Sequence, residues 1–392
     1  MKLPRCCPQP ALLALLALLA PLASPLFAQT EPDPRTNWVD HVYPFLYYSS
    51  IDGFWFAGHY DWSSPMGFAD RPEPNFGRIA LDVGASTQGS YAFVVDAQAP
   101  AYWDGWRLGL TLSVTRSNRL GYYGQGNDTH YDRDSIGAGR SYFYRVSRRT
   151  HGARLTVQRK IAGPLRVLVG GTFEHTDFRE LPGETVFQRD RVAGTIRPED
   201  DPFNDAVGRA GIVVDWRDLE ADPHRGVFAE ALVASGRGYT RTTATVRAYA
   251  HPFDRLILAA RIGAENMTGT PPLGAQLTME TSEGPIVAVG GYRSLRGYHD
   301  GRFVGPGKIV GGVEARYGLI WAPRLLEIKL FAFYDAGRVF RSGEAVRLTR
   351  RGLHAAMGGG VAVSLMRNTL VTLFGGKGTE GAEVGFATTW SY

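Results

Sequence analysis

The chain has 392 residues, 44% of them hydrophobic and 21% charged, with 43 Lys and Arg against 38 Asp and Glu. Its 48 Gly and 23 Pro argue against a helical bundle, because both residues destabilise helices, and 12% aromatic residues argue against disorder. After residue 30, no apolar run approaches the ~20 residues that a membrane helix requires. The interspersed charges indicate no nucleic-acid partner. A large all-β protein remains.

The first 28 residues are typical of a secretory signal. A basic start precedes the compact apolar run Ala11–Ala20, and Ala28 offers a small residue at a plausible cleavage point. We therefore expect a signal peptide over 1–28 and a short periplasmic N-terminal segment over 29–42. Both cysteines lie inside this signal, so the exported chain would contain no disulfide and no cysteine-based metal site.

The rest of the chain contains many segments of about ten residues in which apolar and polar side chains alternate. In one of them, Leu326, Ile328 and Leu330 alternate with Glu327 and Lys329. A soluble β-sandwich would also alternate, with its polar faces toward solvent. Charged residues recur on one face of strand after strand, as in a transmembrane barrel whose polar face lines the lumen and whose apolar face meets lipid.

The periodicity predicts an all-β fold, a 16-stranded antiparallel transmembrane β-barrel over residues 43–392. An even strand number is what a closed bacterial barrel requires. The expected strands are 54–60, 77–86, 89–98, 106–117, 140–148, 151–160, 165–177, 207–217, 226–236, 240–251, 255–267, 307–320, 325–335, 354–366, 369–376 and 383–392.

The lengths of the connections give a second indication of a barrel. If the odd-to-even connections lie outside, the long ones include 61–76, 178–206, 268–306 and 336–353, and most of the others are short turns. Long loops outside and short turns inside are typical of bacterial barrels. The exception is 118–139, a long segment on the side where a short turn is expected.

The last expected strand ends on aromatic residues. Val384, Phe386, Thr388, Trp390 and Tyr392 share one face, and small or polar residues occupy the other. Outward-facing Trp390 and Tyr392 would suit an aromatic girdle at the lipid interface. We predict that Phe386, Trp390 and Tyr392 form a C-terminal assembly signal.

The connection 268–306 contains the most specific sequence of the chain, GGYRSLRGYHDGRFVGPG over 290–307. Its glycines are too frequent for a strand, and a disordered loop would not interleave them with Tyr292, Tyr298 and Phe303. This composition indicates a compact loop that folds back and packs into the barrel.

Three arginines of this loop, Arg293, Arg296 and Arg302, would then lie near or inside the lumen. A buried guanidinium needs a carboxylate partner. The strand alternation places two carboxylates facing inward on adjacent strands, Glu314 and Asp335. The alternative is that both are ordinary water-exposed charges of a lumen.

The motif Leu295-Arg296-Gly297-Tyr298 resembles the Val/Leu-Arg-Gly-Tyr/Phe signature of the bacterial surface antigen family. This is the superfamily of BamA, TamA and the two-partner-secretion transporters, in which the motif occupies the tip of the sixth extracellular loop. The resemblance covers essentially all of the exported chain. Further matching segments are Tyr123–Asp128, Asp215–Gly226, Gly312–Tyr317 and Phe331–Gly337.

The resemblance implies that Arg296 reaches down the lumen to Asp335, with Glu314 nearby, and so locks the loop to the barrel wall. It also implies a location in the outer membrane of a Gram-negative bacterium, in contact with outer-membrane lipid. Members that insert or secrete proteins carry periplasmic polypeptide-transport-associated (POTRA) domains before the barrel. Because the first strand-like segment begins at Tyr43, we expect a barrel-only member without such a domain.

Two functions remain open. The first is insertion or translocation of an unfolded outer-membrane or secreted client in outer-membrane biogenesis, with a separate periplasmic partner and a seam between the first and last strands. The second is a passive or gated pore for small solutes or lipids. The basic residues that would make such a lumen favour anions are Arg154, Lys160, Arg247, Arg261, Arg316 and Lys329.

A third class, an outer-membrane hydrolase, finds no support in the sequence. None of the nine histidines shows a metal-ligand spacing, and no Gly-x-Ser-x-Gly nucleophile elbow occurs. We therefore expect no enzymatic activity, no catalytic residue, no metal and no cofactor.

Overall fold

The computed structural model describes residues 33–49, 51–66, 71–137, 140–287, 289–323, 325–366 and 369–392. The expected signal over 1–28, which contains both cysteines, lies outside the described residues and stays a prediction. Among the residues that are described, no helix is long and apolar enough to cross a membrane.

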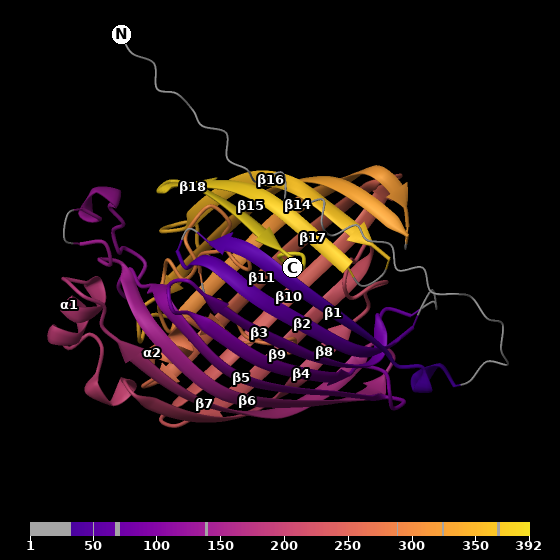
Figure 1. The fold of residues 1–392 in the computed structure, drawn as a ribbon, viewed down its shortest axis with the longest axis horizontal. Helices are drawn as coiled ribbons and strands as arrows, with labels where there is room; N and C mark the ends of the chain where they lie inside the picture. The colour runs from indigo at the N-terminus through magenta and orange to yellow at the C-terminus, as the bar shows by residue number, and fades with distance from the viewer. Residues whose placement is uncertain are drawn as a thin grey trace, which may run out of the picture.

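Sixteen strands form one antiparallel sheet in which each strand pairs with its neighbours in chain order, beginning with β1 and ending with β18. The sheet curls into a barrel, and the indigo β1 lies on the same side of the molecule as the yellow β17 and β18 (Figure 1). The strands are β1 (Val39–Ser49), β2 (Gly53–Pro65), β3 (Asn75–Ser86), β4 (Tyr91–Ala99), β5 (Trp106–Gly121), β6 (Arg145–Ala162), β7 (Leu165–Arg179), β8 (Phe203–Asp215), β9 (Gly226–Gly236), β10 (Tyr239–Phe253), β11 (Leu256–Gly269), β14 (Gly307–Ala322), β15 (Leu326–Phe340), β16 (His354–Leu365), β17 (Thr369–Gly378) and β18 (Gly381–Ala387).

The connections contain the remaining elements. The loop between β11 and β14 holds the short helix α2 (Leu273–Gln276) and a two-stranded pair, β12 (Thr278–Met279) with β13 (Ile286–Val287). The helix α1 (Val186–Val192) lies between β7 and β8. Three 3-10 turns complete the list: η1 (Pro34–Thr36), η2 (Arg133–Ser135) and η3 (Pro198–Asp200).

Side chains alternate across the barrel wall as the sequence predicts. In β15, Leu330 and Tyr334 are 45% and 47% exposed on the outer face, whereas Lys329 and Asp335 are fully buried on the inner face. An apolar outer face with a charged inner face is the pattern of a barrel wall in lipid. Together with the strand order, this pattern confirms the predicted all-β, 16-stranded antiparallel barrel with a long loop in its lumen.

The strand count is confirmed, but two errors in the expected strands cancel. β1 begins at Val39, so residues 39–42 belong to the barrel and not to the N-terminal segment expected over 29–42. Its apolar side chains occupy both faces, with Val42 66% and Tyr43 45% exposed, and therefore show no alternation. Conversely, the two strands expected over 140–148 and 151–160 are parts of one strand, β6, in which Thr150 pairs with both Thr115 and Thr176.

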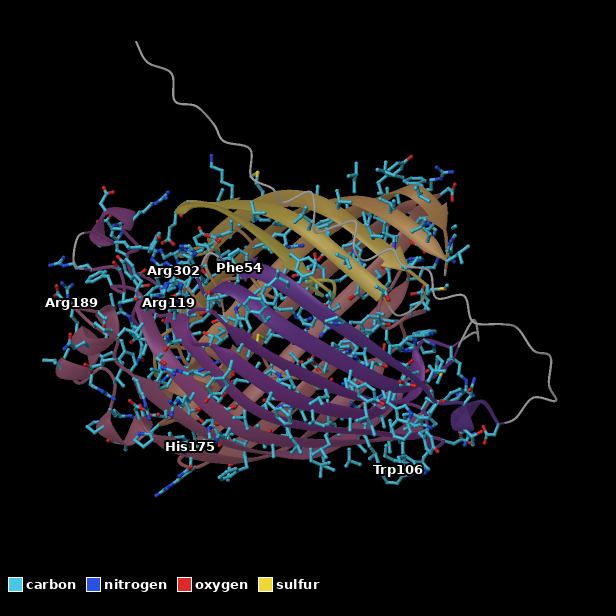
Figure 2. All side chains as sticks on the ribbon, in the orientation of Figure 1. Phe54, Trp106, Arg119, His175, Arg189 and Arg302 are labelled. Carbon is cyan, nitrogen blue, oxygen red and sulfur yellow. The ribbon has the colours of Figure 1, made fainter. Side chains whose placement is uncertain are left out.

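When β1 is counted as the first strand, the long connection over 118–139 no longer lies on the side where a short turn is expected. It joins β5 to β6, so it lies at the same end as the other long connections 180–202, 270–306 and 341–353. We call this the loop end and the opposite one the turn end. The connection expected outside over 61–76 is the segment between β2 and β3, and it lies at the turn end. Figure 2 shows Arg119, Arg189 and Arg302 at the loop end and Trp106 at the turn end.

The end of the chain differs from the expected outward strand over 383–392. β18 stops at Ala387, and only its first aromatic faces outward, Phe386 being 59% exposed. Trp390 and Tyr392 are each 4% exposed and lie inside the barrel, so their predicted place in an outer aromatic girdle is wrong. The reason is that the indole N–H and both rings find polar and cationic partners within the lumen.

This topology makes a labelling prediction. If the loop end faces outward, as in bacterial barrels, a cysteine replacing Asp128 should react with a membrane-impermeant maleimide on intact cells, whereas one replacing Asp254 should not. Both side chains are well exposed, at 78% and 82%, and so differ only in the side they face. Permeabilised cells, in which both react, are the control, and labelling of Asp254→Cys on intact cells would contradict the topology.

Candidate functional site

The loop between β11 and β14 fills the lumen with its own core. Leu295 and Phe303 are fully buried and Tyr298 is 3% exposed. They pack in one cluster with Met279 of β12 and with Val310 and Val339 of the barrel wall. The expected compact loop is therefore an internal plug, which we call the lumen loop (residues 270–306).

Arg296 joins the lumen loop to the barrel wall. Its Nε and Nη2 donate to the two carboxylate oxygens of Asp335 over 2.7 and 3.0 Å, and its backbone N–H donates to Asp335 Oδ2 over 3.2 Å. Its Nη1 donates to Glu314. The guanidinium carbon lies 3.6 Å from the centroid of the Phe333 ring. Arg296 is 1% exposed, so these contacts are sealed from water.

The contacts of Arg296 with Asp335 and Glu314, which we call the lock, are balanced in charge. Glu314 Oε1 accepts from Nε of Arg316 over 2.7 Å, so two carboxylates face two guanidiniums. A buried pair of this kind contributes little net stability when it is complete, but removal of one partner leaves an uncompensated buried charge. Arg296, Glu314 and Asp335 thus form the group that the sequence placed together.

Two glycines make room for the lock. Gly297 has a φ of +101°, and a side chain there would start 2.9 Å from the backbone of Lys377 in β17. Gly312 pairs directly with Asp335 across β14 and β15, and a Cβ at this position would collide with the Asp335 carboxylate. In the predicted motif, Tyr298 completes the contact, with its hydroxyl 3.0 Å from Thr379 Oγ1.

The other two loop arginines bind partners that the sequence did not suggest. Arg302 is fully buried and forms a two-pronged pair with Glu380, both N–O distances being 2.7 Å. Arg293 donates to Thr389 Oγ1 over 3.2 Å. Glu380 lies in the turn between β17 and β18, a position that strand alternation does not address.

Further ion pairs line the lumen. Glu265 of β11 accepts from Lys308 over 2.7 Å, and Glu283 of the lumen loop pairs with Arg217 over 2.9 Å and with Arg247 over 2.7 Å. The sequence analysis missed these carboxylates because each partner comes from a different strand or turn. Their charges show that the lumen is held by ionic contacts as much as by apolar packing.

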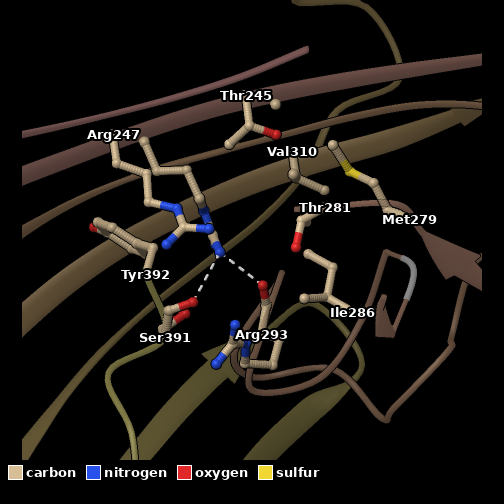
Figure 3. A pocket seen from close by; sticks show the side chains of 11 residues that line it. Thr245, Arg247, Met279, Thr281, Ile286, Arg293, Val310, Ser391 and Tyr392 are labelled. Atoms are coloured by element: carbon tan, nitrogen blue, oxygen red, sulfur yellow. Dashed lines mark hydrogen bonds between the residues drawn. The ribbon is translucent and has the colours of Figure 1, made fainter. Parts of the chain in front are cut away.

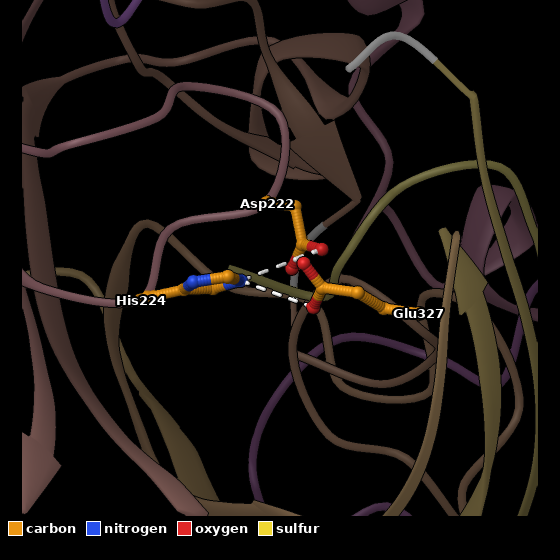
Figure 4. A group of neighbouring side chains, drawn as sticks. All are labelled: Asp222, His224 and Glu327. Atoms are coloured by element: carbon orange, nitrogen blue, oxygen red, sulfur yellow. Dashed lines mark ion pairs between the residues drawn. The ribbon is translucent and has the colours of Figure 1, made fainter. Parts of the chain in front are cut away.

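At the turn end, Asp222, His224 and Glu327 form a cluster of titratable side chains (Figure 4). Their potential ligand atoms lie within 4.8 Å of one another. Sequence spacing could not reveal this group, because Glu327 lies in β15 and the other two in the turn between β8 and β9. The ammonium of Lys329 pairs with both carboxylates, at 2.5 Å from Glu327, so the cluster is compensated by this chain's own cations.

His224 lies in the turn between β8 and β9, outside the strands. Burial by itself lowers its pKa, but its contacts with Asp222 and Glu327 outweigh burial and raise the pKa of His224 to about 9. Its Nε2 lies 3.3 Å from Glu327 Oε2, and its ring stacks on Trp321 at 5.2 Å.

The first prediction from this geometry concerns the lock. Arg296→Ala should destabilise the barrel by ~3–5 kcal/mol, because it leaves the buried Asp335 carboxylate without its paired cation, whereas Glu314 keeps Arg316. Arg296→Lys should restore only part of the loss, since an ammonium cannot bind the Asp335 carboxylate in two places. Urea unfolding in detergent, followed by tryptophan fluorescence, measures both. Arg341→Ala, at a side chain 76% exposed, is the matched control, and equal stability of the two alanine variants would contradict the lock.

The second prediction is a pH dependence. Because the pKa of His224 is raised, its contribution to stability is complete below the ordinary value near 6.5 and is lost as the pH rises through about 9. The thermal unfolding midpoint of the parent chain should therefore fall between pH 7 and 10 by more than that of His224→Gln. Parallel curves for the two proteins would show that His224 does not titrate in this way.

Comparison with known proteins identifies the family. A family model for the Omp85 superfamily domain matches residues 76–369. BamA from Haemophilus ducreyi, in a structure lacking POTRA domains 1–3, matches with a TM-score of 0.54 at 14% identity, over 88% of this chain and 69% of that chain. CdiB from Escherichia coli matches with a TM-score of 0.54 at 10% identity, over 89% of this chain and 60% of that chain.

A search of curated proteins gave no match. At these low identities, the matches to the solved structures show a shared fold alone. The chain spans less than two thirds of the CdiB chain. The family match covers most of this chain, including the lumen loop, and it confirms the resemblance inferred from the sequence. The chain belongs to the Omp85 superfamily and is a β-barrel of the Gram-negative outer membrane.

Proposed function

We propose that this barrel inserts or translocates polypeptide clients at the outer membrane. The clients are unfolded outer-membrane or secreted proteins, and a separate periplasmic protein delivers them to the turn end. The proposal requires no catalysis and no cofactor. Family membership and the BamA and CdiB folds support this class of function.

The observation that carries the proposal is the contrast between the locked and the unlocked parts of the barrel. The lumen loop is tied to β14, β15 and the turn after β17 through Glu314, Asp335 and Glu380. β1 takes no part in these three contacts, and β18, which meets the lumen loop through the pair between Glu383 and His299 at 2.9 Å, has only seven residues. β18 pairs with β17 over seven residues only, the shortest pairing in the 16-stranded sheet, so few backbone hydrogen bonds hold this terminal strand to the wall.

β1 also has the surface of a strand that binds another strand. Its lumen-side residues Tyr43, Phe45 and Tyr47 are 41–45% exposed, and its outward Val42 and Leu46 are also exposed. Most other strands carry charged side chains on their inner faces, although β17 has the buried Leu370 and Phe374 there. An edge strand of this kind can pair with an extended client through its backbone and hold it with its side chains.

The pore that the sequence left open fits the lumen less well. Of the basic residues that would favour anions, Arg247, Arg261, Arg316 and Lys329 are each at most 7% exposed, and Arg154 pairs with Glu280. Basic side chains that are buried or paired inside the protein do not line a water-filled channel. A steady conductance in planar bilayers, unchanged when the seam is locked, would favour the pore.

A seam-locking experiment tests the proposal. Cysteines placed in turn at Val42, Pro44 and Leu46 of β1, which face outward as Val384 does, are each combined with Val384→Cys in β18 to identify the pair that oxidises most completely. The oxidised barrel should lose client assembly in a reconstituted liposome assay, because the two strands can no longer separate, and reduction should restore it.

The matched control is a disulfide between Leu258→Cys and Ala315→Cys, which pair directly across β11 and β14 and face outward. This cross-link should leave assembly unchanged. Full assembly by the oxidised seam pair would rule out a function that depends on separation of β1 and β18.

A further inference from the structure

The four residues Thr389–Tyr392, which we call the tail segment, lie inside the barrel beyond the end of β18. Trp390, Ser391 and Tyr392 are 4%, 2% and 4% exposed. A strand continued in the wall would have placed both aromatic rings in lipid. The tail segment instead lies between the barrel wall, the turn after β8 and the lumen loop.

Trp390 attaches the tail segment to the barrel. Its indole Nε1 donates to Asp222 Oδ1 over 2.7 Å, and the guanidinium carbon of Arg316 lies 3.6 Å from the centroid of the indole ring. The ring of Phe331 meets the indole edge-on at 5.5 Å. Asp222 belongs to the turn between β8 and β9, whereas Arg316 and Phe331 belong to β14 and β15, so Trp390 contacts parts of the barrel that lie far apart along the chain.

Thr389 and Ser391 attach the tail segment to the lumen loop. Ser391 Oγ donates to the backbone oxygen of Tyr292 over 2.7 Å, and the Tyr292 hydroxyl donates to the backbone oxygen of Thr389. Arg293 donates to the Thr389 hydroxyl over 3.2 Å. Tyr292 and Arg293 immediately precede the locked motif that begins at Leu295.

Arg261 of β11 holds the tail segment and the lumen loop at once. Its Nη1 donates to the backbone oxygens of Arg293 over 2.6 Å and Ser391 over 3.2 Å, and its Nη2 donates to that of Ser294 over 2.9 Å. The two dashed lines in Figure 3 end on the labelled Arg293 and Ser391. Its guanidinium carbon also lies 4.4 Å from the centroid of the Tyr392 ring. The cavity left among these groups has a volume of only about 10 Å³.

We propose that the tail segment is an internal latch that couples the last strand to the lumen loop. Ala387 is the final residue of β18, so the strand and the latch are separated by a single residue. Movement of β18 away from the wall pulls on Trp390 and Ser391 and thereby loosens Tyr292, Arg293 and the lock behind them. The coupling is reciprocal, because release of the lumen loop also removes the contacts that hold the tail segment.

The latch does not depend on the identity of a client and is testable without one. Ser282→Cys provides a reporter in the lumen loop, since Ser282 is 7% exposed and its backbone N–H, which a cysteine retains, donates to Glu230. Trp390→Phe keeps an aromatic ring but removes the N–H donor to Asp222. The rate at which maleimide labels Ser282→Cys in the folded barrel should then rise about tenfold, the effect of losing one hydrogen bond to a charged group.

The control is Phe386→Leu, which alters an aromatic residue of the same strand on its lipid-facing side and should leave the labelling rate unchanged. Tyr292→Phe, which removes the hydroxyl bound to Thr389, should raise the rate in the same direction as Trp390→Phe. Heat-dependent mobility in electrophoresis identifies the folded fraction of each variant. Folded Trp390→Phe and Tyr292→Phe barrels that label at the parent rate would overturn the latch, as would an equal rise in Phe386→Leu.

Discussion

The buried pair between Arg296 and Asp335, with Glu314 as the second acceptor, is the contact on which the interior of this barrel depends. A guanidinium in a sealed lumen is tolerated only when carboxylates surround it. Here it donates two hydrogen bonds to Asp335 and one to Glu314, and the backbone N–H of Arg296 donates a further one to Asp335. Glycine is needed at positions 297 and 312, because a Cβ there would lie too close to the backbone of Lys377 or to the carboxylate of Asp335. The apolar cluster of the lumen loop and the pair between Arg302 and Glu380 act on the same loop and hold it in the same place.

Ionic contacts of this density also decide what the lumen can do. Charges that face inward from β10, β11, β14 and β15 form ion pairs with one another, with the lumen loop and with the turns. These pairs hold the lumen loop and the barrel wall together. The barrel is consequently divided into a firmly packed wall and a more exposed region around β1. This division agrees with a function at the seam more readily than with flow through the centre.

Strand alternation predicted the barrel wall well, because the direction of each side chain in a strand is a local property with a period of two. It failed for β1, whose residues are apolar on both faces, and for β6, where consecutive arginines interrupt the pattern without interrupting the strand. Because β1 was missed and β6 was divided into two, the strands between them were numbered one too low. The connection over 118–139 was therefore expected at the wrong end of the barrel. The lock residues were predictable because Glu314 and Asp335 lie within strands of clear alternation and Arg296 lies in a motif that resembles a known family.

By itself, the sequence determined the inward face of most of the wall, the loop that enters the lumen and the three charged residues that hold it. The expected strand number was right only because two errors cancelled. Only the tertiary structure decided where the tail segment goes and which carboxylates serve the remaining cations. The physical reason is separation along the chain: Trp390 finds its acceptor at Asp222, 168 residues away, and Arg302 finds Glu380, 78 residues away. Alternation assigns Trp390 and Tyr392 to lipid, but buried hydrogen bonds and guanidinium–ring contacts from distant strands outweigh that local preference.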